Sequence, residues 1–225
     1  MALKGILFDL DNTQIDFMSM KKACSRAAVQ AMADHGLKMD AEDAYQLLFS
    51  LFQEHGIENK EIFQLFLERA AGEINPLVLA HGIVAYRDTQ RAYRKPYARV
   101  AETLLWLREH GLKLAIVSDA PTLKACLRMV EVGLDPFYHA VVGYDDTKHF
   151  KPHPVPFQKG LEALNIQPEE ALMVGDRPDR DIKGAKALGI KTCYAQYGNA
   201  NESCEDADFV IQEFEDLKKV VLGLL

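Results

Sequence analysis

Short apolar runs recur along the chain, separated by longer stretches in which apolar residues repeat at helical spacing. The first run, residues 3–10 (LKGILFDL), is rich in Ile, Leu and Phe and predicts a buried strand. Similar runs predict strands at 112–117, 140–143, 171–175 and 191–194, with a weaker one at 208–211. Because these runs alternate with helical patterns, we expect an α/β fold with a doubly wound, mainly parallel, Rossmann-like sheet.

The helical patterns between the predicted strands each end where a helix stop is expected. Amphipathic stretches are followed by Gly or Asn at four places: Gly111, Gly133, Asn165 and Gly189. Glycine and asparagine tolerate the left-handed backbone that commonly closes a helix. The patterns therefore predict helices at 99–110, 123–132, 156–164 and 181–188.

One long segment breaks the alternation of strands and helices. It contains four helical patterns, at 18–35, 41–55, 60–71 and 76–95, and no convincing strand. Pro96 ends the series. A segment of this length is about the size of a small domain. The sequence therefore predicts an α/β core made of residues 1–16 and 96–225, with residues 17–95 inserted as an all-helical cap domain.

The composition narrows the class of protein. A hydrophobic content of 48% and a charged content of 26% are ordinary for a globular chain. The net charge of −7 lacks the basic surplus of a nucleic-acid binder. The first apolar run meets Asp9 and Asp11 too soon for a signal peptide or a membrane span. We therefore expect a cytoplasmic protein with no nucleic acid or membrane as partner, either a monomer or a homodimer.

The four cysteines, at positions 24, 126, 193 and 204, are scattered and include no CxxC pair. This spacing is not typical of a zinc site or of a disulfide framework. Reduced thiols are the simpler interpretation, as expected in the cytoplasm.

Polar residues that could carry chemistry follow the ends of several predicted strands. Open parallel sheets bind ligands at the carboxyl ends of their strands. Asp9 and Asp11 follow the first strand, and a period of two along an extended segment would point both carboxylates the same way. Two like charges this close are tolerated where a cation or a phosphoryl group uses them. A loop of helix-capping acids is the alternative, although it would need only one Asp.

The second signal follows the strand at 112–117. The hydroxyl of Ser118 can donate to a phosphate oxygen beside the exposed amides of the next helix. Ser118 or Asp119 serves equally well as a helix N-cap before Pro121.

The third signal is Lys151, which precedes Pro152 in a segment that we expect to be extended, so that the ammonium reaches a defined point.

The fourth signal follows the strand at 171–175. Asp176 lies where a metal ligand from this strand would be placed, and Asp181 lies five residues further on, near the start of a predicted helix. Asp181 could instead be a first-turn acid that faces the helix dipole. Magnesium prefers oxygen ligands and keeps several waters, so a few carboxylates and a substrate phosphate suffice to bind it.

Taken together and in this order, these signals resemble the motifs of the haloacid dehalogenase superfamily of hydrolases, phosphatase type, with a helical cap inserted after the first core strand. The resemblance covers nearly the whole chain. It is carried by residues 8–13 (FDLDNT), residues 116–118 (IVS), Lys151-Pro152, and Gly175-Asp176 with Asp181. It implies a Mg²⁺-dependent phosphatase that hydrolyses a small phosphorylated metabolite through an aspartyl phosphate.

The resemblance also implies roles for individual residues. Asp9 would be the nucleophile and Asp11 the general acid and base. The phosphoryl group would be bound by Ser118, Asp119 and Lys151. The metal would be held by the Asp9 carboxylate, the Asp11 backbone carbonyl and Asp176. Supporting positions around these ligands would be taken by Asp181 and Thr13.

Two positions depart from the pattern of the family. Gln14 stands where relatives commonly carry an apolar residue, and Asn12 replaces a frequent glycine. Neither change removes a catalytic atom. Three arginines of the helical segment, Arg87, Arg91 and Arg94, recur at helical spacing. They form either a solvated face or a contact with substrate.

Other activities use related machinery. A phosphomutase that moves phosphate within a sugar shares the core and differs mainly in the cap. A 2-haloacid dehalogenase has no use for an acid such as Asp11, because halide leaves without a proton. A phospho-accepting signalling domain also combines aspartates, a hydroxyl and a lysine, but it needs neither Asp11 nor a helical insertion.

Overall fold

The computed structural model describes residues 2–225, and its strands form a parallel sheet. The sheet has the order β3-β2-β1-β4-β5-β6. The strand bounds are β1 (Gly5–Phe8), β2 (Lys113–Val117), β3 (Ala140–Val142), β4 (Ala171–Gly175), β5 (Lys191–Ala195) and β6 (Phe209–Ile211). β1 lies between β2 and β4, where the order of the strands changes direction. The predicted α/β, doubly wound fold is confirmed.

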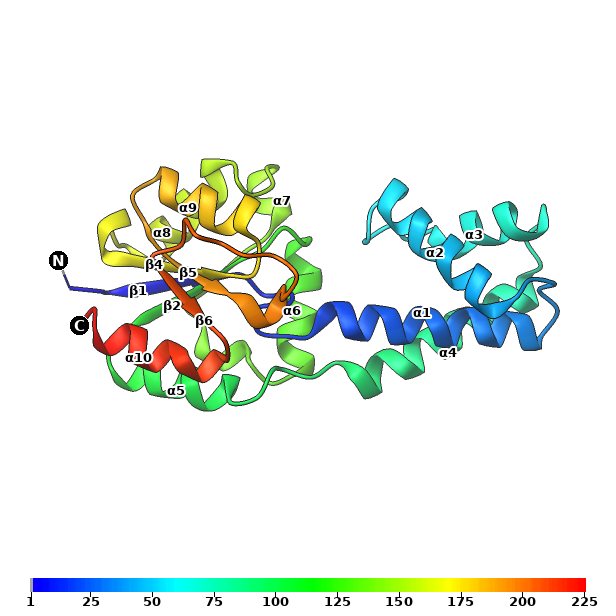
Figure 1. The fold of residues 1–225 in the computed structure, drawn as a ribbon, viewed down its shortest axis with the longest axis horizontal. Helices are drawn as coiled ribbons and strands as arrows, with labels where there is room; N and C mark the ends of the chain where they lie inside the picture. Colours follow the sequence, from blue (N-terminus) through cyan, green and yellow to red (C-terminus); the bar gives the residue numbers. More distant parts are fainter. Residues whose placement is uncertain (1) are drawn as a thin grey trace. The chain divides into compact units, whose positions relative to one another are not determined.

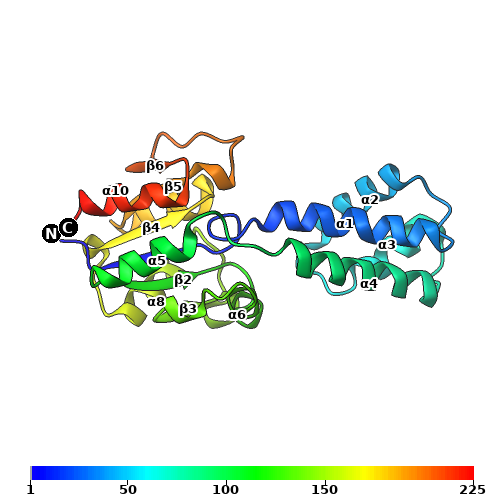
Figure 2. The ribbon, with the colours of Figure 1, turned by 90° about the horizontal axis from the view of Figure 1, so that it is seen from below.

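Helices cover both faces of the sheet (Figures 1 and 2). α5 (Val100–Glu109) and α10 (Leu217–Leu222) lie on one face, and α8 (Pro154–Leu164) and α9 (Lys183–Ala187) lie on the other. Successive residues of β1 serve the two cores in turn, because side chains alternate along a strand. Phe8 packs in the core with α5 and α10, whereas Leu7 packs in the core with α8.

Residues Phe17–Arg94 form a compact helical unit with a core of its own. Its helices are α1 (Phe17–Asp34), α2 (Ala41–His55), α3 (Ile62–Ala71) and α4 (Pro76–Tyr93). The other unit contains the residues up to Asp16 together with Lys95–Leu225. Within the helical unit, α1 and α4 approach so closely that a Cβ at Gly82 would collide with Met32. Its function as a cap remains a prediction.

The core helices end as the glycine and asparagine positions predict. Gly111, Gly133 and Gly189 have φ values of 78°, 69° and 80°, and Asn165 follows α8 with φ 52°. Two short helices, α7 (Tyr144–Thr147) and α10, were not predicted because they are too short for a helical period to show. The remaining helix, α6, spans Thr122–Glu131. Within residues 2–225, none of the helices combines the length and the apolar character needed to cross a bilayer.

The helix predicted at 181–188 begins later than expected. A π-helical turn at Pro178–Ile182 precedes α9. The amide of Asp181 donates to the carbonyl of Arg177, and the Arg177 amide donates to Oδ2 of Asp181 at 3.1 Å. Asp181 is therefore held by the turn that follows β4 and is not a first-turn acid of α9.

Candidate active site

The loop after β1 carries the first two predicted aspartates. The Asp9 amide still donates to the Val174 carbonyl of β4 at 2.9 Å, but the chain then turns back on itself. The Leu10 carbonyl accepts from the amides of Gln14 and Ile15, and Asn12 adopts a φ of 58°. The turn therefore begins at Asn12, after both aspartates, and Asp11 itself forms an isolated bridge with Ile15.

Asp9 and Asp11 contact different cationic side chains. Oδ1 of Asp9 lies 2.6 Å from the ammonium of Lys151. Asp11 pairs instead with Arg128, a buried arginine of α6. Each carboxylate therefore has a cationic partner of its own, and the parallel orientation of the two carboxylates stays a prediction.

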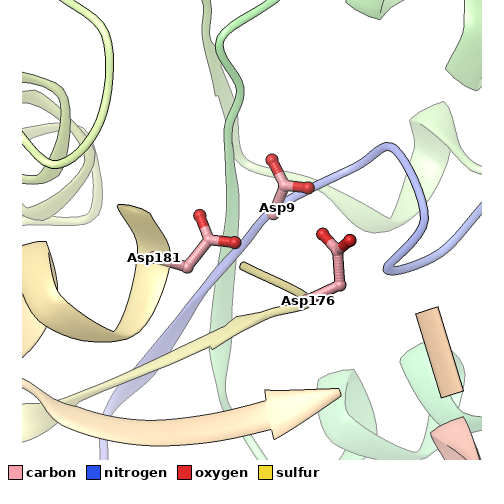
Figure 3. A group of neighbouring side chains, drawn as sticks. All are labelled: Asp9, Asp176 and Asp181. Atoms are coloured by element: carbon pink, nitrogen blue, oxygen red, sulfur yellow. The ribbon is translucent and has the colours of Figure 1, made fainter. Parts of the chain in front are cut away.

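Three carboxylates gather at the carboxyl edge of the sheet (Figure 3). Asp9 follows β1, Asp176 follows β4, and Asp181 comes from the π-helical turn; all three are buried. One oxygen from each lies within 4.8 Å of the others. Gly175 makes this approach possible, because a Cβ at that position would collide with the Asp181 side chain.

Lys151 joins this cluster from the loop before α8. Its ammonium donates to Oδ1 of Asp9 at 2.6 Å and to the Val117 carbonyl at 2.9 Å. It also lies 2.6 Å from Oδ1 of Asp181, an ion-pair contact; among residues 2–225 this oxygen accepts no well-aligned hydrogen bond. Burial lowers the pKa of Lys151, but the facing Asp181 and Asp9 outweigh burial and raise the pKa above its usual range.

The segment around Lys151 is a turn, which differs from the extended loop that its prolines predict. The amide of His153 donates to the Phe150 carbonyl at 3.0 Å and closes the turn. The Lys151 amide donates to Oδ1 of Asp119 at 2.8 Å. The lysine is thus held at its backbone as well as at its ammonium.

The electrostatics of the cluster fit a divalent cation. Burial, with the charges of Asp9 and Asp181, raises the pKa of Asp176 to about 8. Burial also raises the pKa of Asp181 to about 7 against the opposing charge of Lys151. Three carboxylates and one ammonium give a formal charge of −2, which one divalent cation would cancel. Carboxylate oxygens are ligands that Mg²⁺ prefers, so this donor set fits it.

The remaining predicted positions lie around the cluster. Ser118 is buried, and its hydroxyl accepts from the Ala120 amide at 3.1 Å. Asp119 links two loops, because its Oδ2 also lies 3.3 Å from Nη1 of Arg180. The hydroxyl of Thr13 makes a long hydrogen bond of 3.5 Å to Oδ1 of Asp176. The N-cap of α6 is Pro121, so neither Ser118 nor Asp119 takes the alternative capping position.

Other residues near the site were not singled out from the sequence. Arg128 lies on the buried side of α6, where the periodic pattern predicts packing and reveals no partner. The hydroxyl of Tyr197 donates to the Thr13 carbonyl at 2.6 Å. Gly198 allows the Asn12 carbonyl to approach, since a Cβ there would collide with it. No motif in the sequence signals these contacts.

The arginine stripe of the helical unit is only partly exposed. Arg87 and Arg91 are exposed, whereas Arg94 is partly buried. Both interpretations of these arginines, a solvated face or a contact with substrate, stay predictions.

Comparison with known proteins gives the class to which this fold and site belong. Residues 3–189 match the family described as haloacid dehalogenase-like hydrolase. The chain is 36% identical over 223 residues to a glyceraldehyde 3-phosphate phosphatase of Pyrococcus furiosus, an alignment that covers 97% of this chain and 93% of that protein. The chain therefore belongs to the haloacid dehalogenase-like hydrolases.

Solved structures agree on the fold. A HAD phosphatase from Thermococcus onnurineus superposes with a TM-score of 0.74 at 24% identity and covers 99% of each chain. A putative beta-phosphoglucomutase from Thermotoga maritima superposes with a TM-score of 0.79 at 19% identity, over 99% of this chain and 100% of that one. Within the family, the match to a named phosphatase along nearly the whole chain makes this protein an enzyme of the phosphoric monoester hydrolase class.

Proposed function

We propose that the protein is a Mg²⁺-dependent phosphatase that hydrolyses a small phosphate monoester through an aspartyl phosphate on Asp9. The observation that carries the proposal is the buried cluster of Asp9, Asp176, Asp181 and Lys151 at the carboxyl edge of the sheet. Glyceraldehyde 3-phosphate is the first substrate to test, because the similar protein of Pyrococcus furiosus is named for it.

Asp9 is suited to nucleophilic attack by its position at the end of β1 and by its contact with Lys151. A carboxylate that approaches a phosphate is an anion approaching an anion, so a positive charge must offset the repulsion. The Lys151 ammonium, 2.6 Å from Oδ1 of Asp9, supplies such a charge. The bond from Asp9 to phosphorus forms as the bond from phosphorus to the substrate oxygen breaks.

Asp11 is the residue that we assign to proton transfer. It would give a proton to the leaving alkoxide and then take one from the water that attacks phosphorus in the second step. That step breaks the bond between Asp9 and phosphorus, releases inorganic phosphate and restores the carboxylate. The Asp11 side chain is 22% exposed even though it pairs with Arg128.

The metal would be held by the carboxylates of Asp9 and Asp176 with the backbone carbonyl of Asp11, and Asp181 would support the ligands. When bound, Mg²⁺ supplies positive charge that stabilises the developing charge on the phosphoryl oxygens. Ser118 and Asp119 lie at the end of β2, where we place the rest of the phosphoryl-binding site. Substrate selection by the helical unit, Phe17–Arg94, is part of the same proposal.

The test is phosphate release from glyceraldehyde 3-phosphate and a panel of other phosphorylated metabolites, with Mg²⁺ and with a chelator. We expect chelator to abolish turnover and Asp9→Asn to lower it by several orders of magnitude while the fold is retained. Asp206→Asn is the matched control, because it removes the same charge at an exposed position of the same unit. Full activity in chelator would contradict the metal assignment, and substantial turnover by Asp9→Asn would remove Asp9 as nucleophile.

Three further readouts separate the alternatives. Formation of an isomeric sugar phosphate without release of phosphate would indicate a mutase. Release of halide from a 2-haloacid would indicate a dehalogenase. A phosphoaspartate that persists without turnover would indicate a signalling domain.

A further inference from the structure

Gln14 is a fully buried polar side chain in the loop that carries Asp9 and Asp11. Its Nε2 donates to the backbone carbonyl of Asp9 at 3.1 Å. Its Oε1 accepts a hydrogen bond from the hydroxyl of Tyr138. This amide therefore connects the strand end that presents Asp9 with the segment that leads into β3.

The chemistry of the partners determines how the amide is oriented. A backbone carbonyl can only accept, so the NH₂ group of Gln14 must face Asp9, and its oxygen is left for the Tyr138 hydroxyl. Burial of that hydroxyl raises the pKa of Tyr138 well above its usual range, so the phenol stays protonated and donates. The Tyr138 ring also packs edge-on against Phe8, with ring centroids 6.1 Å apart.

The backbone of Gln14 holds the same loop in place. Its amide donates to the Leu10 carbonyl at 2.9 Å, and its carbonyl accepts from the Tyr97 amide at 2.9 Å. The residue is thus anchored by its main chain while its side chain reaches back to Asp9. An apolar residue at this position could fill the volume, but it would leave the Asp9 carbonyl without this donor and the Tyr138 hydroxyl without its acceptor.

We propose that Gln14 is a positioning residue that holds the backbone of Asp9, and through it the direction in which the Asp9 carboxylate attacks, with Tyr138 orienting the Gln14 amide. The inference rests on the proposed role of Asp9 as nucleophile.

The test compares kcat and KM for wild type, Gln14→Leu, Tyr138→Phe and the double variant. We expect Gln14→Leu to lower kcat roughly ten- to a hundredfold, since small misplacements of a reacting group are costly, with KM changed less than about threefold. We expect Tyr138→Phe to lower kcat less than Gln14→Leu does, because the Gln14 side-chain amide keeps its contact with the Asp9 carbonyl. The double variant matches Gln14→Leu, because Tyr138 acts through Gln14.

Thr192→Val is the matched control for loss of a buried hydrogen bond. Thr192 is buried in β5, and its hydroxyl lies 2.8 Å from Oδ2 of Asp208. We expect this variant to lower the melting temperature and to leave kcat unchanged. Should Gln14→Leu fail to fold, Gln14→Met keeps the length of the side chain without its polar atoms and should show the same loss of kcat.

Two results would overturn the inference while leaving the proposed function intact. One is a folded Gln14→Leu enzyme with a lower melting temperature and a kcat within about twofold of wild type, which would make Gln14 structural only. The other is an additive loss in the double variant, which would separate Tyr138 from Gln14. Failure of the proposed function shows differently, as a wild-type protein that releases no phosphate or as an active Asp9→Asn variant.

Discussion

Replacement of Lys151 by methionine tests the electrostatic balance of the buried cluster. Lys151 is 4% exposed, and its ammonium lies 2.6 Å from a carboxylate oxygen of both Asp9 and Asp181. Methionine keeps most of the volume and removes the charge. The carboxylates of Asp9, Asp176 and Asp181 then lose the ammonium that offsets their repulsion.

The expected loss of stability follows from the burial of this ion pair. Removal of one partner of a buried pair costs about 3–5 kcal/mol, because the other charge is left uncompensated. In a chain of this size, 1 kcal/mol shifts the melting temperature by roughly 2–4 °C, so Lys151→Met should melt about 6–20 °C lower in chelator. Folding raises the pKa of Lys151, so the lysine contributes to stability fully at any pH below the pKa of an unfolded lysine. A pH of 7.5 lies well below that value, so the full contribution to stability is measured there.

Thermal unfolding is followed by circular dichroism at pH 7.5, once in EDTA and once in about 5 mM Mg²⁺, and gives the change in melting temperature. We expect Mg²⁺ to raise the melting temperature of Lys151→Met more than that of wild type, because the cation replaces the missing positive charge. Lys219→Met is the matched control, since Lys219 is exposed and should change the melting temperature little. A Lys151→Met protein that melts within about 2 °C of wild type in EDTA would refute the reasoning.

Two further predictions concern the core and the thiols. Gly160→Ala should lower the free energy of unfolding in urea by about 1–3 kcal/mol, because its Cβ would lie 2.8 Å from Cγ2 of Val117. Gly223→Ala is the control and should be nearly neutral, because no neighbour of its Cβ would be closer than 3.5 Å. Equal effects of the two substitutions would contradict the packing argument. Burial raises the pKa of Cys24 to about 11, so only a small fraction of this thiol is thiolate at pH 8. We therefore expect iodoacetamide to alkylate Cys24 at least roughly tenfold more slowly than the partly exposed Cys126. Peptide mass spectrometry would measure the two rates.

Much of the fold was predictable because its elements carry strong patterns. Most core strands are runs of apolar residues, although β5 begins with Lys191 and Thr192, and the helices between the strands are closed by residues that tolerate positive φ. The missed elements, α7 and α10, have four and six residues, so neither shows two full helical periods. The π-helical turn at Pro178–Ile182 was also missed. A π turn and an α turn differ in their backbone hydrogen bonds, and the spacing of apolar residues does not distinguish the two.

The edge of the sheet where the site lies was predictable, but the pairing of charges there was not. Asp9, Ser118 and Asp176 each follow a strand, and parallel strands bring those ends together. The partner of Asp11 is separated from it by 117 residues and lies on a helix whose pattern reports only which side is buried. Amphipathic periodicity gives the face of a residue and says nothing about the charge opposite it.

The loop that follows Asp11 depends on the backbone conformation of Asn12. Asn12 adopts a φ of 58°, a left-handed conformation that asparagine tolerates more readily than most residues. With that single residue in the left-handed region, the Gln14 amide reaches the Leu10 carbonyl and its side chain reaches Asp9. Two polar residues therefore act in one loop: Asn12 permits the turn, and Gln14 ties it to the strand end that presents Asp9.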